Sequence, residues 1–266
     1  MQTAIGGAAP GATLLVRGTC TGPFAIDEDL TLIGLGGAVL DGNQAGSVVT
    51  VTGAVRVRLH ELTVTNGAGG NGGGIRNDGG TLELTGSSVE HNTAGGGGGI
   101  YNHAGSTVRL TGSTVSDNTG HSGGGLINFG TVRLTGSTVE RNTSTIDGGG
   151  LYNNFDATLT LTASTVRDNT AARSGGGVYN IFDSAVALVG SSVRGNTAGA
   201  DGGGIWNDLD STVTLAGSSV HGNTAGNDGG GVYNHAGSTV TLIGSAVRDN
   251  RPNNCGGAVP VPGCTG

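Results

Sequence analysis

Apolar and polar residues alternate in short runs along most of the chain. In the segment STVTL (211–215), valine and leucine alternate with threonine, a period of two that is rich in β-branched residues. That pattern predicts a β-strand whose alternate side chains point inward. Two more short strands are expected beside it, at GIWN (204–207) and SSVH (218–221). No helical spacing is found within this stretch.

This three-strand unit is repeated along the chain. A glycine triplet marks each unit, and its third glycine recurs every 25 to 27 residues, at Gly74, Gly99, Gly125, Gly150, Gly177, Gly204 and Gly231. Three strands and three bends in about 26 residues describe one rung, a single turn of a parallel β-solenoid, stacked on the next rung at about 4.8 Å.

The inward positions of successive rungs carry only aliphatic side chains. One column contains Ile75, Ile100, Leu126, Leu151, Val178, Ile205 and Val232, and a second contains Val108, Val132, Leu159, Val186, Val213 and Val240. One rung cannot bury its apolar face alone, so the stack supplies the core. The predicted fold is all-β, a single right-handed parallel β-helix of about ten rungs with three short strands per rung.

The recurring asparagines and glycines are interpreted as structural. An asparagine follows a valine-containing segment in each unit, at Asn92, Asn118, Asn142, Asn169, Asn196, Asn223 and Asn250. Stacked asparagines hydrogen-bond from rung to rung, so we expect an asparagine ladder inside the bends. The glycine triplets allow tight bends and close approach of neighbouring rungs.

Composition and charge exclude several other classes of protein. Glycine accounts for 57 of 266 residues, yet there are only 5 prolines, which excludes collagen. Glycine at this density excludes a helical bundle, and an apolar content of 35% excludes a disordered linker. A net charge of -7 argues against nucleic acid and anionic membranes as partners, and no apolar run is long enough to span a membrane.

The chain is expected to form one domain over residues 1–266. It comprises an N-terminal cap with the opening rungs (1–70), seven GGGxxN repeats (71–250) and a C-terminal cap (251–266). The N-terminus lacks a basic region followed by an apolar stretch, so no signal peptide is expected in this chain. Cys255 and Cys264 lie nine residues apart and are expected to form a disulfide, which suits an oxidising compartment.

The sequence resembles the pectate-lyase-like superfamily of right-handed parallel β-helix proteins. The opening segment GATLLVRGTCTGPFAIDEDLTLIGLGGAVLDG (11–42) is similar to the first rungs of its carbohydrate-binding and sugar-hydrolase repeat domains. The GGGIYN and NTA motifs are similar to those of bacterial surface proteins and, distantly, of polymorphic outer-membrane proteins, whose FxxN motif has Phe where Val115, Val139 and Val166 stand here. The resemblance implies an extracellular or cell-surface location. Members include lyases, glycosidases, epimerases, adhesins and autotransporter passengers, so the fold alone does not give the function.

Candidate catalytic residues lie in the opening rungs. Enzymes of the superfamily that act as lyases use carboxylates for calcium and an arginine or lysine as the base. Asp41, Arg58 and His60 would form a site if these rungs brought them together around a groove. The alternative is that they are solvated residues of bends and strands.

A candidate metal site is provided by an acidic series. Asp156, Asp183 and Asp210 recur 27 residues apart, each in a bend just after a GGGxxN strand. Carboxylates in register repel one another unless a cation bridges them, so calcium is conceivable. The alternative is a row of exposed bend residues, and no other cofactor is expected.

Two outward columns are candidate ligand-binding surfaces. The first contains the aromatic residues Tyr101, Tyr152, Tyr179, Trp206 and Tyr233, with Ile127 in the same series. Such rings stack on sugars or fill a partner's pocket, but they also stack on one another to cover backbone. The second column contains Arg167, Arg194 and Arg248, which would meet an acidic polysaccharide or are isolated surface residues.

Two functions follow from these patterns. The first hypothesis is a non-catalytic extracellular or cell-surface protein that binds polysaccharide or a surface partner along one face of the solenoid. The second is a polysaccharide lyase, hydrolase or epimerase. The first is favoured because short regular bends leave no long loops to wall a cleft.

Overall fold

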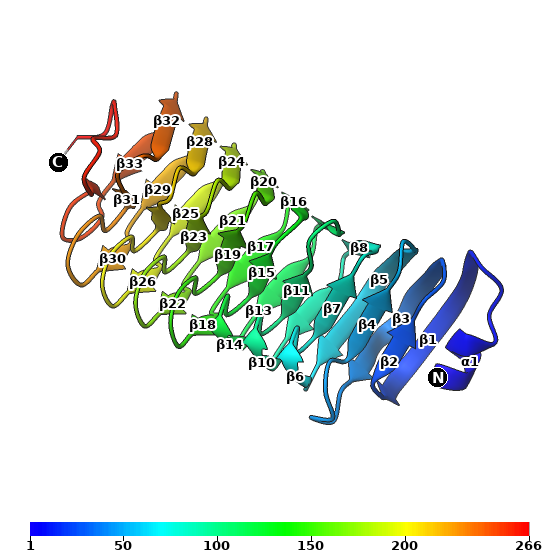
Figure 1. Ribbon diagram of the computed structural model, residues 1–266. Helices are drawn as coiled ribbons and strands as arrows, with labels where there is room; N and C mark the ends of the chain where they lie inside the picture. Colours follow the sequence, from blue (N-terminus) through cyan, green and yellow to red (C-terminus); the bar gives the residue numbers. More distant parts are fainter. Residues whose placement is uncertain (266) are drawn as a thin grey trace.

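The computed structural model describes residues 1–265, and these form a solenoid of stacked rungs. Figure 1 shows the rungs following one another along a single axis, from a short helix, α1 (Gln2–Gly6), to the C-terminal tail at the opposite end. Every paired strand is parallel to its neighbours, and the strands form three sheets. The solenoid has about nine rungs, one fewer than expected.

Sheet A contains two strands from most rungs. Its strands are β1 (Ala12–Thr21), β3 (Leu30–Asp41), β5 (Arg56–Thr65), β8 (Thr81–Thr85), β9 (Ser88–Glu90), β12 (Thr107–Thr111), β13 (Thr114–Ser116), β16 (Thr131–Thr135), β17 (Thr138–Glu140), β20 (Thr158–Thr162), β21 (Thr165–Arg167), β24 (Ala185–Val189), β25 (Ser192–Arg194), β28 (Thr212–Ala216), β29 (Ser219–His221), β32 (Thr239–Ile243) and β33 (Ala246–Arg248).

Sheets B and C contribute one strand from each rung that they cross. Sheet B consists of β2 (Phe24–Ile26), β4 (Val49–Thr52), β7 (Ile75–Asp78), β11 (Ile100–Asn102), β15 (Leu126–Asn128), β19 (Leu151–Asn154), β23 (Val178–Ile181), β27 (Ile205–Asn207), β31 (Val232–Asn234) and β34 (Cys255–Gly256). Sheet C consists of β6 (Ala68–Asn71), β10 (Thr93–Gly96), β14 (Thr119–Ser122), β18 (Thr143–Ser144), β22 (Thr170–Ala171), β26 (Thr197–Ala198) and β30 (Thr224–Ala225).

The assignment of strands to sheets differs from the sequence-based expectation. The segments STVTL and SSVH become β28 and β29, and both belong to sheet A, on either side of a bend at Gly217 (φ +56°). The third sheet is instead built from the NTA motif and the equivalent segments of the earlier rungs, which form the strands of sheet C. These strands are only two to four residues long and are rich in small residues, so no alternation of apolar and polar side chains could reveal them.

The core is the column of aliphatic side chains enclosed by the three sheets. The predicted columns on sheets B and A are paired residue by residue, as in Val178↔Ile205 and Val186↔Val213. Every member is at most 3% exposed, which confirms the inward positions. Ile5 of α1 covers the first rung, and Val261 of the tail covers the last, beside a disulfide between Cys255 and Cys264.

Two asparagine ladders run along the solenoid at two of its bends. In the first, each side chain from Asn92 to Asn250 is linked to the next, and Asn169 Nδ2 donates to Asn196 Oδ1 at 2.9 Å. The asparagines of the GGGxxN motif, from Asn77 to Asn234, form the second, with Asn180 Nδ2 donating to Asn207 Oδ1 at 2.8 Å. The ladders satisfy polar groups that the bends bury, which confirms their predicted structural role.

Close packing of the rungs requires the middle glycine of each triplet. A Cβ on Gly176 would lie 2.4 Å from the carbonyl oxygen of Gly203 and 2.5 Å from that of Thr197. Any side chain at this position would therefore force neighbouring rungs apart. Among residues 1–265, no helix is long and apolar enough to cross a membrane.

The first prediction concerns the ladder. Asn169→Ala leaves the backbone N–H and the Nδ2 of Asn142 without their shared acceptor, and it also removes the hydrogen bond from Asn169 Nδ2 to the Val139 carbonyl. We expect the free energy of unfolding to fall by about 3 kcal/mol in chemical denaturation. Thr162→Ala, an exposed change on the same rung, should cost no more than about 0.5 kcal/mol. Similar losses in the two variants would contradict a stabilising role for the ladder.

Candidate binding face

All nine aromatic residues lie along sheet B or in the bend that follows it; Phe24 of β2 is buried in the core, and the other eight stack along the outer side of the sheet. We call this side of the molecule the aromatic face. The rings form two stacked runs. The Tyr–Trp column contains Tyr152, Tyr179, Trp206 and Tyr233, with neighbouring ring centroids 4.9, 5.9 and 4.3 Å apart. The second run contains Tyr101, Phe129, Phe155 and Phe182, with centroids 5.6, 6.2 and 4.7 Å apart.

The register of sheet B places the Tyr–Trp column. On each strand the side chains of the aliphatic residue and the asparagine point inward, so the residue between them points outward. Tyr152 is paired with Tyr179, Tyr179 with Trp206, and Trp206 with Tyr233. Tyr101 joins this series through Ile127, which interrupts the ring stack.

The rings of the column pack against their own glycine bends. A Cβ on Gly175 would lie 2.7 Å from the Cβ of Tyr179, so only glycine at this position leaves room for the aromatic side chain. Tyr179 is only 6% exposed, whereas Tyr101, Tyr152, Trp206 and Tyr233 are half-buried. Burial raises the pKa of Tyr152 to about 12 and also raises the pKa of Tyr179. The column therefore covers backbone and offers a ligand only part of its surface.

The Phe ridge, formed by Phe155, Phe182 and Leu209, is the exposed part of the aromatic face. These side chains are 56%, 38% and 39% exposed, in the bends between sheets B and A. Their φ angles of +52°, +57° and +50° lie in the left-handed region, which bulky residues rarely adopt. Each such residue costs about 1–3 kcal/mol, so the fold holds apolar side chains in solvent at an energetic cost.

The Phe ridge is confined to the central repeats. Hydrogen bonds keep its bends in register, with the Asp156 N–H donating to the Phe182 carbonyl at 3.0 Å and the Asp183 N–H to the Leu209 carbonyl at 2.9 Å. The preceding repeat has Phe129-Gly130 at this bend, and His-Ala-Gly stands there at 103–105 and at 235–237. The signal was present in the sequence as NNFD, NIFD and NDLD, where an apolar residue stands in a bend of otherwise polar residues.

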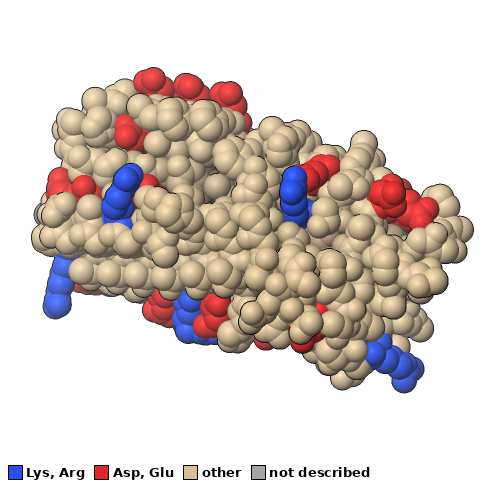
Figure 2. All heavy atoms as spheres, turned by 60° about the horizontal axis from the view of Figure 1, so that its bottom comes forward, with Lys and Arg blue, Asp and Glu red and all other residues tan. Residues whose placement is uncertain are grey.

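Carboxylates flank the aromatic face on both sides. On the side of the glycine triplets, Asp147, Asp201 and Asp228 belong to one row together with Ser174, because the N–H of the glycine after each member donates to the carbonyl of the next member. On the other side, Asp208 lies 2.9 Å from the Nδ1 of His235. Figure 2 shows acidic side chains in a row along one edge of the molecule, whereas basic side chains stand singly on the face in view.

The carboxylates of this row differ in their affinity for protons. Burial raises the pKa of Asp147, although Arg173 lies 2.9 Å away. Burial and the neighbouring Asp228 raise the pKa of Asp201. At Asp228, burial is outweighed by hydrogen bonds from Asn253 and from the backbone of Gly257 and Gly229, which lower its pKa. The two adjacent carboxylates are therefore shifted in opposite directions.

The acidic series proposed for calcium lies in the same bends as the Phe ridge. Asp156, Asp183 and Asp210 each follow the apolar residue of the bend, and all three side chains are exposed. Within residues 1–265, no group of three or more His, Cys, Asp or Glu side chains is close enough together to hold a metal ion. Calcium binding by this series stays a prediction that the geometry does not favour.

The three catalytic candidates of the opening rungs are not brought together. Arg58 and His60 lie two residues apart on β5, and the Nε of Arg58 donates to Glu83 at 3.0 Å. Asp41 is paired with Thr65, five residues beyond His60 and past the bend at Glu61 (φ +52°). Its carboxylate accepts hydrogen bonds from the Asn43 N–H and from Asn66. These contacts describe a stabilised bend and an ion pair on sheet A.

The arginine column lies on sheet A, away from the aromatic face. Arg167, Arg194, His221 and Arg248 are paired in that order on adjacent rungs. Arg167 contacts Glu140 and Asp168, and Arg248 contacts Asp249. Within residues 1–265, Arg194 is the one arginine of the column without a carboxylate partner. Most of the positive charge of this column is therefore neutralised.

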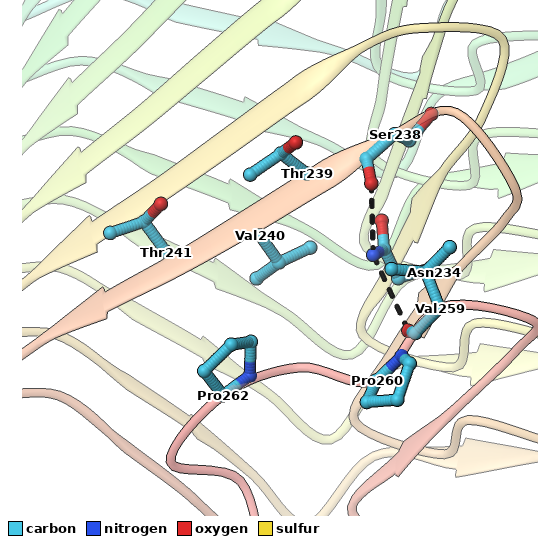
Figure 3. Close-up of a pocket in the computed structure, with 8 residues that line it drawn as sticks. All are labelled: Asn234, Ser238, Thr239, Val240, Thr241, Val259, Pro260 and Pro262. Atoms are coloured by element: carbon cyan, nitrogen blue, oxygen red, sulfur yellow. Dashed lines mark hydrogen bonds between the residues drawn. The ribbon is translucent and has the colours of Figure 1, made fainter.

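Two cavities lie near the ends of the solenoid. A cavity of about 240 Å³ separates β32 from the C-terminal tail, and Figure 3 shows its lining by Asn234, Ser238, Thr239, Val240, Thr241, Val259, Pro260 and Pro262. Asn234 Nδ2 donates there to the carbonyls of Ser238 and Val259. A cavity of about 330 Å³ lies beside α1 and is lined by Met1, Ala4, Leu14, Leu15, Val16, Arg17 and Cys20. Neither contains a pair of carboxylates.

Comparison with known proteins supports the fold. No protein-family model matches the sequence, and no curated protein sequence matches it. Among solved structures, pectate lyase Pel9A is similar with a TM-score of 0.59 and 17% identity, over 95% of this chain and 73% of that one. An alginate lyase from Paenibacillus sp. str. FPU-7 is similar with a TM-score of 0.56 and 14% identity, over 98% of this chain and 95% of that one. At this identity the likeness shows a shared β-helix fold of the pectate-lyase-like type.

The second prediction tests the burial of the Tyr–Trp column. Burial disfavours the phenolate, so Tyr152 ionises at about 12 in the folded protein and near 10 in the unfolded chain. The contribution of the neutral Tyr152 ring to the free energy of unfolding is complete at pH values below the pKa of the unfolded chain, and it is lost as the pH rises toward 12. In a spectrophotometric titration of tyrosine ionisation, Tyr152→Phe should lack part of the absorbance change that the unmodified protein shows near pH 12. Circular dichroism recorded at each pH checks that the protein is still folded. Loss of amplitude near pH 10 would show that the ring is solvated.

Proposed function

We propose that this protein is a non-catalytic polysaccharide-binding protein whose aromatic face receives the ligand. The observation that carries the proposal is the Phe ridge, where Phe155, Phe182 and Leu209 are held in solvent by left-handed bends. Exposed apolar rows on a folded surface are typical of interaction sites, and strained backbone is concentrated at functional sites.

The geometry of the ridge favours a linear polymer. Adjacent rungs are separated by about 4.8 Å, so the face presents the same contact repeatedly along a line. Pyranose rings have apolar C–H faces that pack on aromatic side chains. A polymer that contacts several rungs gains avidity from contacts that are individually weak.

Buried polar atoms without a partner lie on the same face. Trp206 Nε1 has no hydrogen-bond partner within the described chain, and neither has the Oδ1 of Asn154, which is only 7% exposed. Asn154 is the last residue of β19; it lies two residues after Tyr152 of the column and directly before Phe155 of the ridge. Such atoms are expected where a ligand completes the hydrogen bonding. The disulfide at the C-terminal cap supports a location outside the cell or on its surface.

A second candidate function rests on one pair of carboxylates. Asp201 and Asp228 lie opposite each other on adjacent rungs. The pKa of Asp201 is raised and that of Asp228 is lowered. Glycoside hydrolases use two carboxyl groups, about 5–10 Å apart, that are tuned in this way. A polysaccharide-active enzyme with this pair in the acid and base roles is therefore the alternative, and the β-helix lyases among the similar structures are compatible with it.

The third prediction tests the Phe ridge. Phe155→Ala combined with Phe182→Ala removes two exposed rings, so the affinity for the bound polysaccharide should fall by about 2 kcal/mol, roughly a thirtyfold rise in Kd. The polysaccharide would first be found by screening neutral, cationic and uronate glycans, with isothermal titration calorimetry of the hits. Val189→Ala, an exposed apolar change on sheet A, is the matched control and should leave Kd unchanged.

The same glycans would be incubated with the protein and analysed for shortened or unsaturated products. Products that disappear in Asp201→Asn would establish the enzymatic alternative and overturn the non-catalytic proposal. An equal effect of the Val189→Ala control on binding would remove the Phe ridge as the binding surface.

A further inference from the structure

We infer that the aromatic face selects a cationic polysaccharide, a polymer of amino sugars that carry free ammonium groups. This inference rests on the proposed function and adds the charge of the ligand to it. The similar solved structures are lyases named for pectate and alginate, so the inference departs from what the shared fold would suggest.

The negative charge of the protein is concentrated on this face. The part of this face between Asp147 and Asp228 carries seven aspartates on its bends and borders, namely Asp147, Asp156, Asp183, Asp201, Asp208, Asp210 and Asp228, against one arginine, Arg173. Their sum is -6, out of a net charge of -7 for the whole chain. Arg76 and Asp78 of β7 form an ion pair and add no net charge. The remainder of the molecule is therefore nearly neutral.

The carboxylates of the aromatic face are also left without counter-ions. Arg173 forms an ion pair with Asp147, and the Nδ1 of His235 lies within hydrogen-bond distance of Asp208. Asp156, Asp183, Asp201, Asp210 and Asp228 have no basic side chain within 4.0 Å in residues 1–265.

Sheet A of the same molecule is arranged differently. There Glu83 is shared by Arg56, Arg58 and Arg109, and Glu140 contacts Arg141 and Arg167. Within residues 1–265, the chain thus pairs most of its charges on sheet A and leaves five aspartates of the aromatic face without a basic partner. Unpaired like charges in neighbouring rungs destabilise the fold unless a positively charged ligand compensates them.

Polar groups beside the aromatic rings also favour a positively charged ligand. Burial raises the pKa of Tyr233 most, and the charges of Asp201 and Asp228 raise it further, so both carboxylates lie near the stacked rings of Trp206 and Tyr233. The Oδ1 of Asn154 is a buried acceptor without a partner, which an ammonium or hydroxyl group can satisfy. A uronate polymer would instead bring carboxylates to a face that is already negative.

The fourth prediction compares three oligosaccharides of equal length by calorimetry at mildly acidic pH. These are oligoglucosamine, its N-acetylated form and oligogalacturonate, which are cationic, neutral and anionic. We expect oligoglucosamine to bind at least about tenfold tighter than the N-acetylated form, with oligogalacturonate the weakest. The preference should shrink as salt is added, because exposed charges are screened.

Paired variants separate this inference from general electrostatics. Asp183→Asn with Asp210→Asn should reduce the preference for oligoglucosamine. Glu90→Gln on β9 with Asp249→Asn in the bend after β33, an equal change of charge away from the aromatic face, should not. Phe155→Ala should weaken oligoglucosamine but not polylysine. If polylysine bound as tightly as oligoglucosamine and responded equally to Phe155→Ala, the selection for a sugar would be overturned.

The remaining outcomes distinguish the two levels of the proposal. Equal binding of the glucosamine and N-acetylated oligomers, lost in Phe155→Ala, would overturn the selection for charge and leave the proposed polysaccharide binding intact. Tightest binding of oligogalacturonate would overturn the inference as well. Failure of all three oligomers, and of every glycan in the wider screen, would overturn the proposed function itself.

Discussion

The register between neighbouring rungs is the constraint on which the rest of the structure depends. Parallel backbone hydrogen bonds hold each strand against its counterpart about 26 residues away, and the two asparagine ladders hold the bends in the same alignment. A shift by one residue would turn every aliphatic side chain outward and every outward residue into the core. The middle glycine of each triplet allows this alignment, because Gly176 and its equivalents leave no space for a side chain.

The same register turns single outward residues into surfaces. A tyrosine that recurs once per repeat becomes a continuous stack, and an aspartate that recurs becomes a row of charge. Sheet A and the aromatic face show two outcomes of this rule. On sheet A, alternation of sign produces ion pairs such as Arg58 with Glu83 at 3.0 Å. On the aromatic face, repetition of one sign leaves carboxylates unpaired beside exposed rings, and that is the basis for proposing a ligand there.

Much of the fold could be predicted from local pattern, but the surface could not. The columns through Ile205 and Val213 follow from a period of two and a repeat of about 26 residues, and both are buried as expected. The strands of sheet C escaped prediction because two to four small residues show no alternation of apolar and polar side chains. The Tyr–Trp column was predicted in sequence, yet its burial was not, since the glycine bend that receives Tyr179 is visible only in three dimensions. The Phe ridge was missed because alternation assigns no direction to residues in a bend.

The sequence by itself determined that this protein is a parallel solenoid, because every rung repeats the same short-range pattern of strands, glycines and asparagines. Only the tertiary structure decided which unrepeated residues meet. It separated Asp41 from Arg58 and His60 along the strands, neutralised most of the arginine column through Glu140, Asp168 and Asp249, and placed Phe155, Phe182 and Leu209 in left-handed bends beside the rings. The physical reason is that bend geometry and the lateral offset between rungs, which local pattern does not specify, set the direction of each outward side chain.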